Sequence, residues 1–208
     1  SLDMGGRMTL CNMTIEAGAR CGMIAPDDVT LAWLRGRRHA PHGAAFEAAA
    51  VQWLALATDE GAAFDKEVRL DGSAIAPMAT WGTTPDAGLP IGAPLPRPRG
   101  DSEGRALEYM GFEGGVANTS HPIDVVFIGS CTNGRLADLR AAAAVLRGHH
   151  VKANVRMLVV PGSENVRRQA EAEGLHHVFT EAGAEWRLPG CSMCIAMNGD
   201  FVAPGQLA

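Results

Sequence analysis

Short apolar runs alternate with helix-like segments between residues 123 and 188, and this is the clearest pattern in the chain. Each run is rich in branched aliphatic residues, which favours buried strands, and each intervening segment has helical periodicity. The predicted elements are strands at 123–128, 155–160 and 185–188, helices at 135–146 and 164–173, and a short helical or turn segment at 178–184. Strands and helices in alternation predict an α/β fold with a parallel sheet.

The loops that follow the three predicted strands carry the polar residues of greatest interest. Cys131 follows the first strand, Ser163 the second and Cys191 the third. Open parallel sheets bind ligands beyond the carboxyl ends of their strands. We therefore expect these loops to converge at one edge of the sheet.

The first 122 residues predict helices and loops. An apolar stripe formed by Met8, Cys11, Ile15 and Ala19 predicts a helix over 4–21. Further expected elements are a helix that is started by residues 25–28 and ends before Arg35, helices at 44–58 and 102–110, a short strand at 67–71, and a long irregular segment at 75–100. Asp27 or Asp28 is expected to cap the second helix. We expect two regions, a helical and loop region at 1–122 and an α/β domain at 123–208.

Composition narrows the classes of function. The chain has 208 residues, of which 47% are hydrophobic, and a net charge of −5 without a basic face, which argues against nucleic-acid binding. No apolar run is long enough for a membrane span, and no signal peptide is evident. Five cysteines, an odd number without secretory features, argue against a disulfide framework. We expect a cytoplasmic protein.

Three of the cysteines form a candidate metal site. Cys191 and Cys194 form a C-x-x-C pair, and Cys131 lies sixty residues upstream. Thiolates select iron–sulfur clusters, zinc or copper(I), and no fourth ligand with zinc-like spacing is evident. From spacing alone, a cluster with one open iron, a redox-active dithiol, a zinc site and ordinary buried thiols all remain open.

Several motifs resemble those of the aconitase superfamily. The two cysteine motifs are similar at 126–140 and 189–198, the segment 12–27 resembles the superfamily's active-site helix, and 80–83 and 159–163 add to the match. The resemblance covers essentially the whole chain. It implies aconitase-like α/β/α layers with a mostly parallel sheet.

The resemblance implies a 4Fe–4S cluster held by Cys131, Cys191 and Cys194, with a fourth iron open to water or substrate. An open iron acts as a Lewis acid that polarises a poorly leaving hydroxyl group. Ser130 and Asn133 flank the first cysteine and are implied to bind the cofactor through hydrogen bonds to its sulfurs. A tight polar turn is the simpler alternative for these two residues.

Asn12 and Glu16 match positions beside the cluster and are implied to be catalytic. An amide there can bind a sulfur or a substrate oxygen, and a carboxylate can help water to leave or return. Taken alone, Glu16 lies four residues before Arg20, which is a common spacing for an ion pair on a helix surface.

Within the superfamily, the motifs are most similar to the large subunits of the isopropylmalate dehydratase branch. The resemblance implies a hydro-lyase of leucine biosynthesis that isomerises 2-isopropylmalate and 3-isopropylmalate, with a small subunit as partner in a heterodimer or heterotetramer. Homoaconitase or another hydroxy-acid dehydratase is one alternative, and a non-catalytic metal or redox C-x-x-C module is another. Segments of the family's site have no counterpart here. We therefore expect a piece of a longer protein, inactive alone and able to lack its cluster.

Overall fold

The computed structural model of the protein describes residues 2–208. Its contacts group the chain up to Glu60 with Ile123–Ala208 in one compact unit, and Gly61–Pro122 in a second unit. The boundary after residue 122 coincides with the boundary between the two regions expected from the sequence. The structure adds a second boundary after residue 60.

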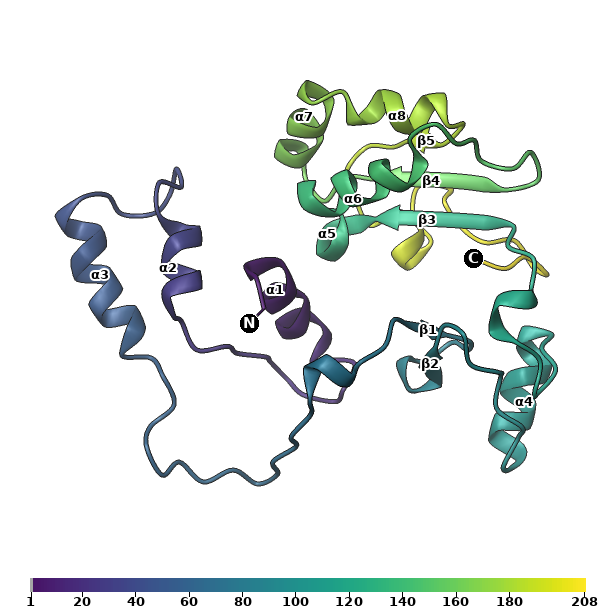
Figure 1. The fold of residues 1–208 in the computed structure, drawn as a ribbon, viewed down its shortest axis with the longest axis horizontal. Helices are drawn as coiled ribbons and strands as arrows, with labels where there is room; N and C mark the ends of the chain where they lie inside the picture. Colours follow the sequence, from purple (N-terminus) through teal and green to yellow (C-terminus); the bar gives the residue numbers. More distant parts are fainter. Residues whose placement is uncertain (1) are drawn as a thin grey trace. The chain divides into compact units, whose positions relative to one another are not determined.

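The elements are labelled in Figure 1. The helices are α1 (Met4–Met13), α2 (Asp28–Leu34), α3 (Ala44–Leu54), α4 (Asp101–Met110), α5 (Ser130–Asn133), α6 (Leu136–Leu146), α7 (Glu164–Ala172) and α8 (Leu175–Glu181). The strands are β1 (Met78–Thr80), β2 (Gly88–Pro90), β3 (Val125–Gly129), β4 (Arg156–Val160) and β5 (Glu185–Trp186). Single 3-10 turns form η1 (Gly72–Ala74), η2 (Pro85–Ala87), η3 (Asn118–Ser120) and η4 (Ser192–Ile195).

A parallel sheet organises the first unit. Its strand order is β3-β4-β5, and both neighbouring pairs are parallel. The register runs from Val125 opposite Arg156 to Gly129 opposite Val160, so β3 and β4 end together. The predicted α/β class with a parallel sheet is confirmed.

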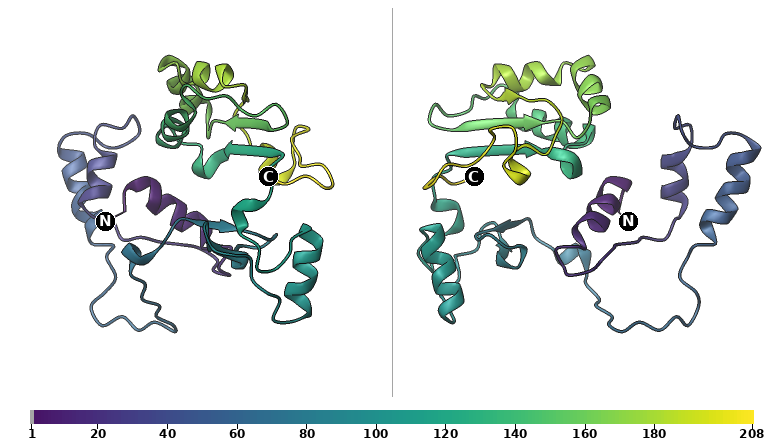
Figure 2. Two further views of the ribbon diagram at one scale, coloured as in Figure 1. Left: turned by 45° about the vertical axis from the view of Figure 1, so that its right-hand side comes forward. Right: turned by 180° about the vertical axis from the view of Figure 1, so that it is seen from behind.

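The core of this unit lies between the sheet and three helices. Met157 and Val159 alternate along β4 and pack with Leu139 of α6 and Phe179 of α8 in one buried cluster. Figures 1 and 2 show α7 and α8 along one side of the sheet. Val160 is also fully buried, which accounts for the continuous apolar run of this strand.

Two predicted helix starts are confirmed by their capping bonds. Asp27 accepts hydrogen bonds from the amides of Val29 and Thr30 at the start of α2. Ser163 accepts one from Val166 at the start of α7. A side-chain oxygen that satisfies these free amides lowers the free energy of the helix start.

The helix predicted over 4–21 is too long, because α1 ends at Met13. The hydroxyl of Thr14 donates to the carbonyl oxygen of Cys11, residues 14–18 form turns, and Gly18 has a φ of 83°. The expected apolar stripe is not buried, since Ile15 is 66% exposed. Without a core to cover, the apolar periodicity did not extend the helix.

The second unit, Gly61–Pro122, has its own small core. β1 and β2 pair in antiparallel register, and Trp81, Leu89, Leu95 and Leu107 form a buried cluster. The expectation of an irregular segment over 75–100 was therefore wrong for these two short strands. The strand predicted over 67–71 is absent, and its residues are exposed without a partner strand.

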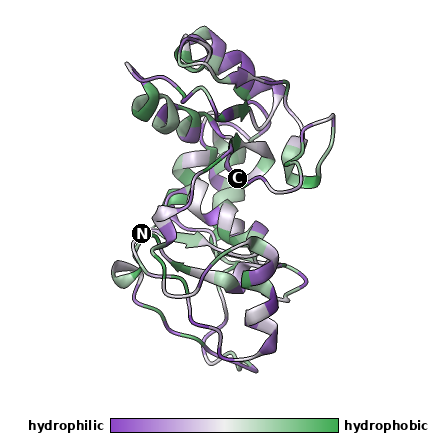
Figure 3. Ribbon diagram, turned by 90° about the vertical axis from the view of Figure 1, so that its right-hand side faces the viewer, coloured by the Kyte–Doolittle hydropathy of each residue, from purple (hydrophilic) through white to green (hydrophobic). Residues whose placement is uncertain are grey.

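The helices carry hydrophilic and hydrophobic residues together, as Figure 3 shows. Mixed colouring along a helix is expected where one side faces a core. None of the helices in the described part of the chain combines the length and the apolar character that a bilayer crossing requires.

Candidate metal centre

The first cysteine turn begins where β3 ends. Gly129 has a φ of 119° and the buried Ser130 a φ of 74°, so the chain bends sharply into the single turn of α5. This bend leaves Cys131 exposed with a free thiol. The hydroxyl oxygens of Ser130 and Thr132 lie 4.0 and 3.9 Å from its Sγ. Left-handed backbone at a non-glycine residue is costly and is typical of functional sites.

Helix α1 lies against this turn, although 120 residues separate them in sequence. The Thr132 hydroxyl donates to Asn12 Oδ1 at 3.1 Å. Thr9 Oγ1 lies 3.0 Å from Asn133 Oδ1 and accepts a hydrogen bond from Arg135 Nη1 at 3.2 Å. The structure thus brings the predicted residues Asn12, Cys131 and Asn133 into one neighbourhood. The oxygen of the Asn12 amide is occupied, which leaves its NH₂ group to donate elsewhere.

Glu16 is placed differently from the expectation. Because α1 ends at Met13, Asn12 and Glu16 do not share a helix face, and Glu16 lies exposed in the following turn. Within residues 2–208 it forms no ion pair with Arg20. The surface pairing that its spacing suggested is therefore not formed.

The second cysteine loop follows β5. The amide of Cys194 donates to the carbonyl oxygen of Cys191 at 3.0 Å, which closes the first turn of the loop. Both thiols are free and exposed. Ser192 between them is 2% exposed, so the loop turns its serine inward and its cysteines outward.

A buried carboxylate lies behind this loop. Asp200 is 2% exposed; its Oδ2 accepts from the Ser192 hydroxyl at 2.7 Å and its Oδ1 accepts from Arg187 Nη2 at 2.5 Å. Burial raises the pKa of this carboxyl, but the hydrogen bonds from Ser192 and Arg187 outweigh burial, and the net pKa lies below its usual range. Asp200 is therefore ionised at neutral pH. No sequence motif singled it out.

The donor set suits an iron–sulfur cluster. Three free, exposed thiols lie on turns outside the strands, with hydroxyl groups beside Cys131. Within residues 2–208, no three ligand side chains lie close enough to share a single metal ion. The three cysteines therefore fit a cluster by the chemistry of their soft thiols, and among residues 2–208 no hydrogen bond joins the Cys131 turn to the Cys191–Cys194 loop.

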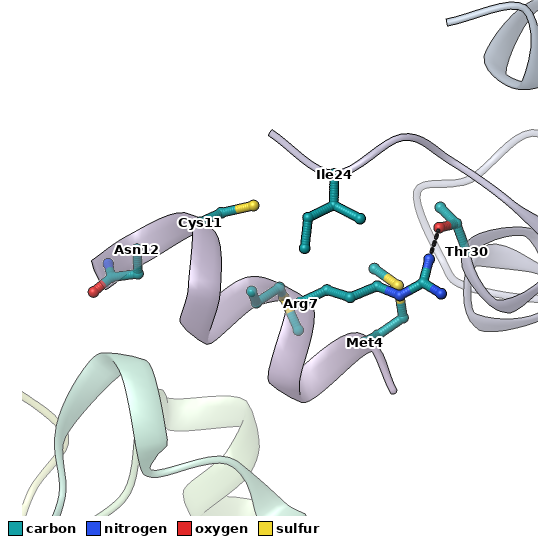
Figure 4. Close-up of a pocket in the computed structure, with 7 residues that line it drawn as sticks. Met4, Arg7, Cys11, Asn12, Ile24 and Thr30 are labelled. Carbon is teal, nitrogen blue, oxygen red and sulfur yellow. Dashed lines mark hydrogen bonds between the residues drawn. The ribbon is translucent and has the colours of Figure 1, made fainter. Parts of the chain in front are cut away.

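A small cavity lies beside α1. It has a volume of about 430 Å³ and is bordered by Met4, Arg7, Met8, Cys11, Asn12, Ile24 and Thr30. Figure 4 shows Arg7 reaching from α1 toward Thr30, whereas Asn12 points away at the far end of the helix. The cavity runs along α1, from Met4 at its start to Asn12 near its end.

Arg7 anchors α1 to α2. Its guanidinium group is buried and forms two bonds with the carboxylate of Asp27, Nη1 to Oδ1 at 2.6 Å and Nη2 to Oδ2 at 2.7 Å. One carboxylate therefore clamps α1 and caps α2 at the same time. The hydrogen bond from Arg7, assisted by the two amides, lowers the pKa of Asp27 from 3.8 to about 2. No motif or spacing predicted this pair, whose members lie twenty residues apart.

The depressed pKa of Asp27 predicts an acid-sensitive contribution to stability. The carboxylate is charged in the folded state down to about pH 2. Its stabilising effect is therefore complete above about pH 4, where the unfolded group is also charged, and is lost as the pH falls toward 2. Urea unfolding between pH 5 and 2 should show a steeper loss for the natural protein than for Asp27→Asn. Asp28→Asn, which removes a neighbouring carboxylate that does not bind Arg7, should keep the natural slope. Equal slopes for all three proteins would contradict the assignment.

Comparison with known proteins defines the class. Residues 1–208 match the aconitase family (aconitate hydratase), so the chain belongs to that family. The chain is also 55% identical, over 213 aligned positions covering 99% of its length, to the 3-isopropylmalate dehydratase large subunit of Solibacter usitatus (strain Ellin6076). It spans 46% of the length of that relative.

Proposed function

We propose that this chain supplies the cluster ligands of a hydro-lyase that interconverts 2-isopropylmalate and 3-isopropylmalate in leucine biosynthesis. The relative named as a 3-isopropylmalate dehydratase large subunit supports the substrate class. The observation that carries the proposal is the meeting of Asn12 with the Cys131 turn, through the hydrogen bond of Thr132 to Asn12. It joins the implied active-site segment to the first implied cluster ligand.

Cys131, Cys191 and Cys194 would hold a 4Fe–4S cluster. When bound, it would supply an iron with an open position, which acts as a Lewis acid on the substrate hydroxyl group. Ser130 and Asn133 would border it, with the Ser130 hydroxyl 4.0 Å from the Cys131 sulfur.

Asn12 and Glu16 would act on the substrate itself. The free NH₂ group of Asn12 would donate to a substrate oxygen and orient it. Glu16, exposed on the turn after α1, would give a proton to the departing hydroxyl group, while a second base would take the proton from the neighbouring carbon. On rehydration of the double bond Glu16 would take a proton from water, and the second base would return its proton to carbon.

The partner would be a small subunit, since the similar protein is named as a large subunit. Homoaconitase or another hydroxy-acid dehydratase remains the alternative within the same chemistry. A C-x-x-C module without catalysis would use Cys191 and Cys194 alone.

The full-length protein, combined with its small subunit and reconstituted with iron and sulfide, should turn over 2-isopropylmalate. Glu16→Gln should keep the iron and lower kcat by about 10²- to 10⁴-fold, the usual size of a general acid–base contribution. Glu181→Gln, an exposed glutamate at the end of α8, is the matched control and should leave kcat within about twofold, as is usual for exposed sites.

Three results would contradict the proposal. Turnover confined to a tricarboxylic hydroxy acid would favour homoaconitase. A reversible Cys191–Cys194 disulfide without bound iron would favour the redox module. A Glu16→Gln enzyme with natural kcat would remove Glu16 from the mechanism.

A further inference from the structure

The loop from Cys191 to Asp200 holds an unusual backbone. Ser192, Ala196 and Asn198 all have positive φ, at 49°, 52° and 61°. Each such residue is disfavoured relative to ordinary backbone, because its Cβ crowds the neighbouring carbonyl oxygen. A loop with three of them persists only if its surroundings hold it in place.

Apolar packing does not supply all of this restraint. One side of the loop borders a cavity of about 460 Å³, lined by Trp186, Arg187, Leu188, Pro189, Ser192, Asn198 and Asp200. Ile195 and Met197, the large apolar residues of the loop near its middle, are 63% and 48% exposed. The inward contact of the loop is polar, and it is the bond from Ser192 to Asp200.

Asp200 is itself held firmly. Arg187 Nη2 lies 2.5 Å and Arg156 Nη2 3.5 Å from its Oδ1, which leaves Oδ2 for the Ser192 hydroxyl. Arg187 follows β5 and Arg156 opens β4, so the carboxylate is tied to the sheet. A buried charge paired in this way has little freedom to move.

Ser192 lies between the two cysteines of the C-x-x-C pair. It lies directly after Cys191 and two residues before Cys194, and its carbonyl oxygen accepts from the amide of Met197 at 2.9 Å. Holding the Ser192 side chain in place therefore restrains the backbone at both Cys191 and Cys194.

We propose that Asp200 is a positioning residue that holds Ser192 against the sheet and thereby presents Cys191 and Cys194 as a preformed pair of soft ligands. This inference rests on the proposed role of the pair as metal ligands. It assigns to Asp200 no contact with substrate or metal.

The test is the affinity of the cluster-free, full-length protein for Cd²⁺, a soft ion that binds paired thiolates. The double variant Cys191→Ser/Cys194→Ser gives the background to be subtracted. Ser192→Ala and Asp200→Asn should each weaken Cd²⁺ binding by about tenfold, the value of one hydrogen bond to a charged group. Amide hydrogen exchange at Cys194 and Met197 should quicken in the same variants.

Glu185→Gln is the matched control. Glu185 pairs with the same two arginines, Arg156 at 2.8 Å and Arg187 at 3.4 Å, but does not bind Ser192. The Glu185→Gln variant should keep Cd²⁺ affinity within about twofold, because it removes only half-exposed ion pairs, which contribute little. Ser192→Ala keeps the buried ion pair, so it remains informative if Asp200→Asn fails to fold.

The outcomes separate this inference from the proposed function. Unchanged Cd²⁺ affinity in Ser192→Ala, or an equal loss in Glu185→Gln, overturns the role of Asp200 even if a cluster is bound. A tenfold loss in Ser192→Ala, in a protein that takes up no iron–sulfur cluster, supports Asp200 and refutes the cluster. A lower melting temperature with natural Cd²⁺ affinity would show a structural role only, and would also overturn the inference.

Discussion

Replacing Cys131 with serine should abolish cluster binding and, with it, all turnover. The variant would lose one of the three thiolate ligands of the cubane. A serine hydroxyl does not replace it, because it is a hard ligand that stays protonated at neutral pH. The reconstituted natural protein should hold about four irons and four acid-labile sulfides, as a cubane requires. The variant should hold neither in that ratio. Iron and sulfide analysis, with the electron paramagnetic resonance signal of the reduced protein, measures the difference.

The matched control for this prediction is Cys21→Ser. Cys21 is also a free and exposed thiol, but it lies outside both cysteine motifs. Its replacement should leave the iron and sulfide content unchanged. A Cys131→Ser protein with the natural iron and sulfide content, or an equal loss in Cys21→Ser, would refute the ligand assignment. Both variants should keep the natural fold, because an exposed cysteine can be replaced without disturbing a core. Circular dichroism checks this.

Replacing Gly129 with alanine should prevent the α/β unit from folding normally. A Cβ at this position would lie 1.9 Å from the carbonyl oxygen of Val160, the residue that pairs with Gly129 across β3 and β4. Its φ of 119° is also accessible to glycine almost alone. Because the obstacle is backbone in a central strand, it cannot be relieved by a side-chain rotation. We expect a loss of about 4 kcal/mol or more in the free energy of unfolding, measured by urea denaturation.

Gly148→Ala separates the clash from the backbone strain. Gly148 has a φ of 78°, but nothing lies within 4 Å of a Cβ added there. Its replacement should cost only the strain of a left-handed residue, about 1–2 kcal/mol. Similar losses of unfolding free energy in Gly129→Ala and Gly148→Ala would show that the clash with Val160 adds nothing to the backbone strain. That result would contradict the prediction.

The expectations that held are those that depend on local chemistry. The caps formed by Asp27 and Ser163 were readable because a short polar side chain before an apolar helical run has few other uses. The strands β3 and β4 were readable because a continuous run of branched apolar residues is buried on both faces of a sheet. The motifs around Cys131 and Cys191 indicated the family, which the comparison confirms for the whole chain.

The expectations that failed depend on what a segment meets in space. Residues 67–71 alternate like a strand, but no partner strand lies beside them. The stripe through Ile15 predicted a longer α1, but no core covers it. Periodicity reports which face could be buried, and only tertiary packing decides whether it is.

The sequence by itself determined the family, the α/β class and the three cysteines as candidate ligands, because motif identity and apolar periodicity are local properties of the chain. The tertiary structure alone revealed that Arg7 ties α1 to Asp27, that Thr132 joins Asn12 to the Cys131 turn, and that Asp200 holds Ser192. These polar contacts join residues that lie between 8 and 120 positions apart along the chain. Such bonds form only where the fold brings a donor and an acceptor within about 3 Å, and no spacing along the chain encodes that distance.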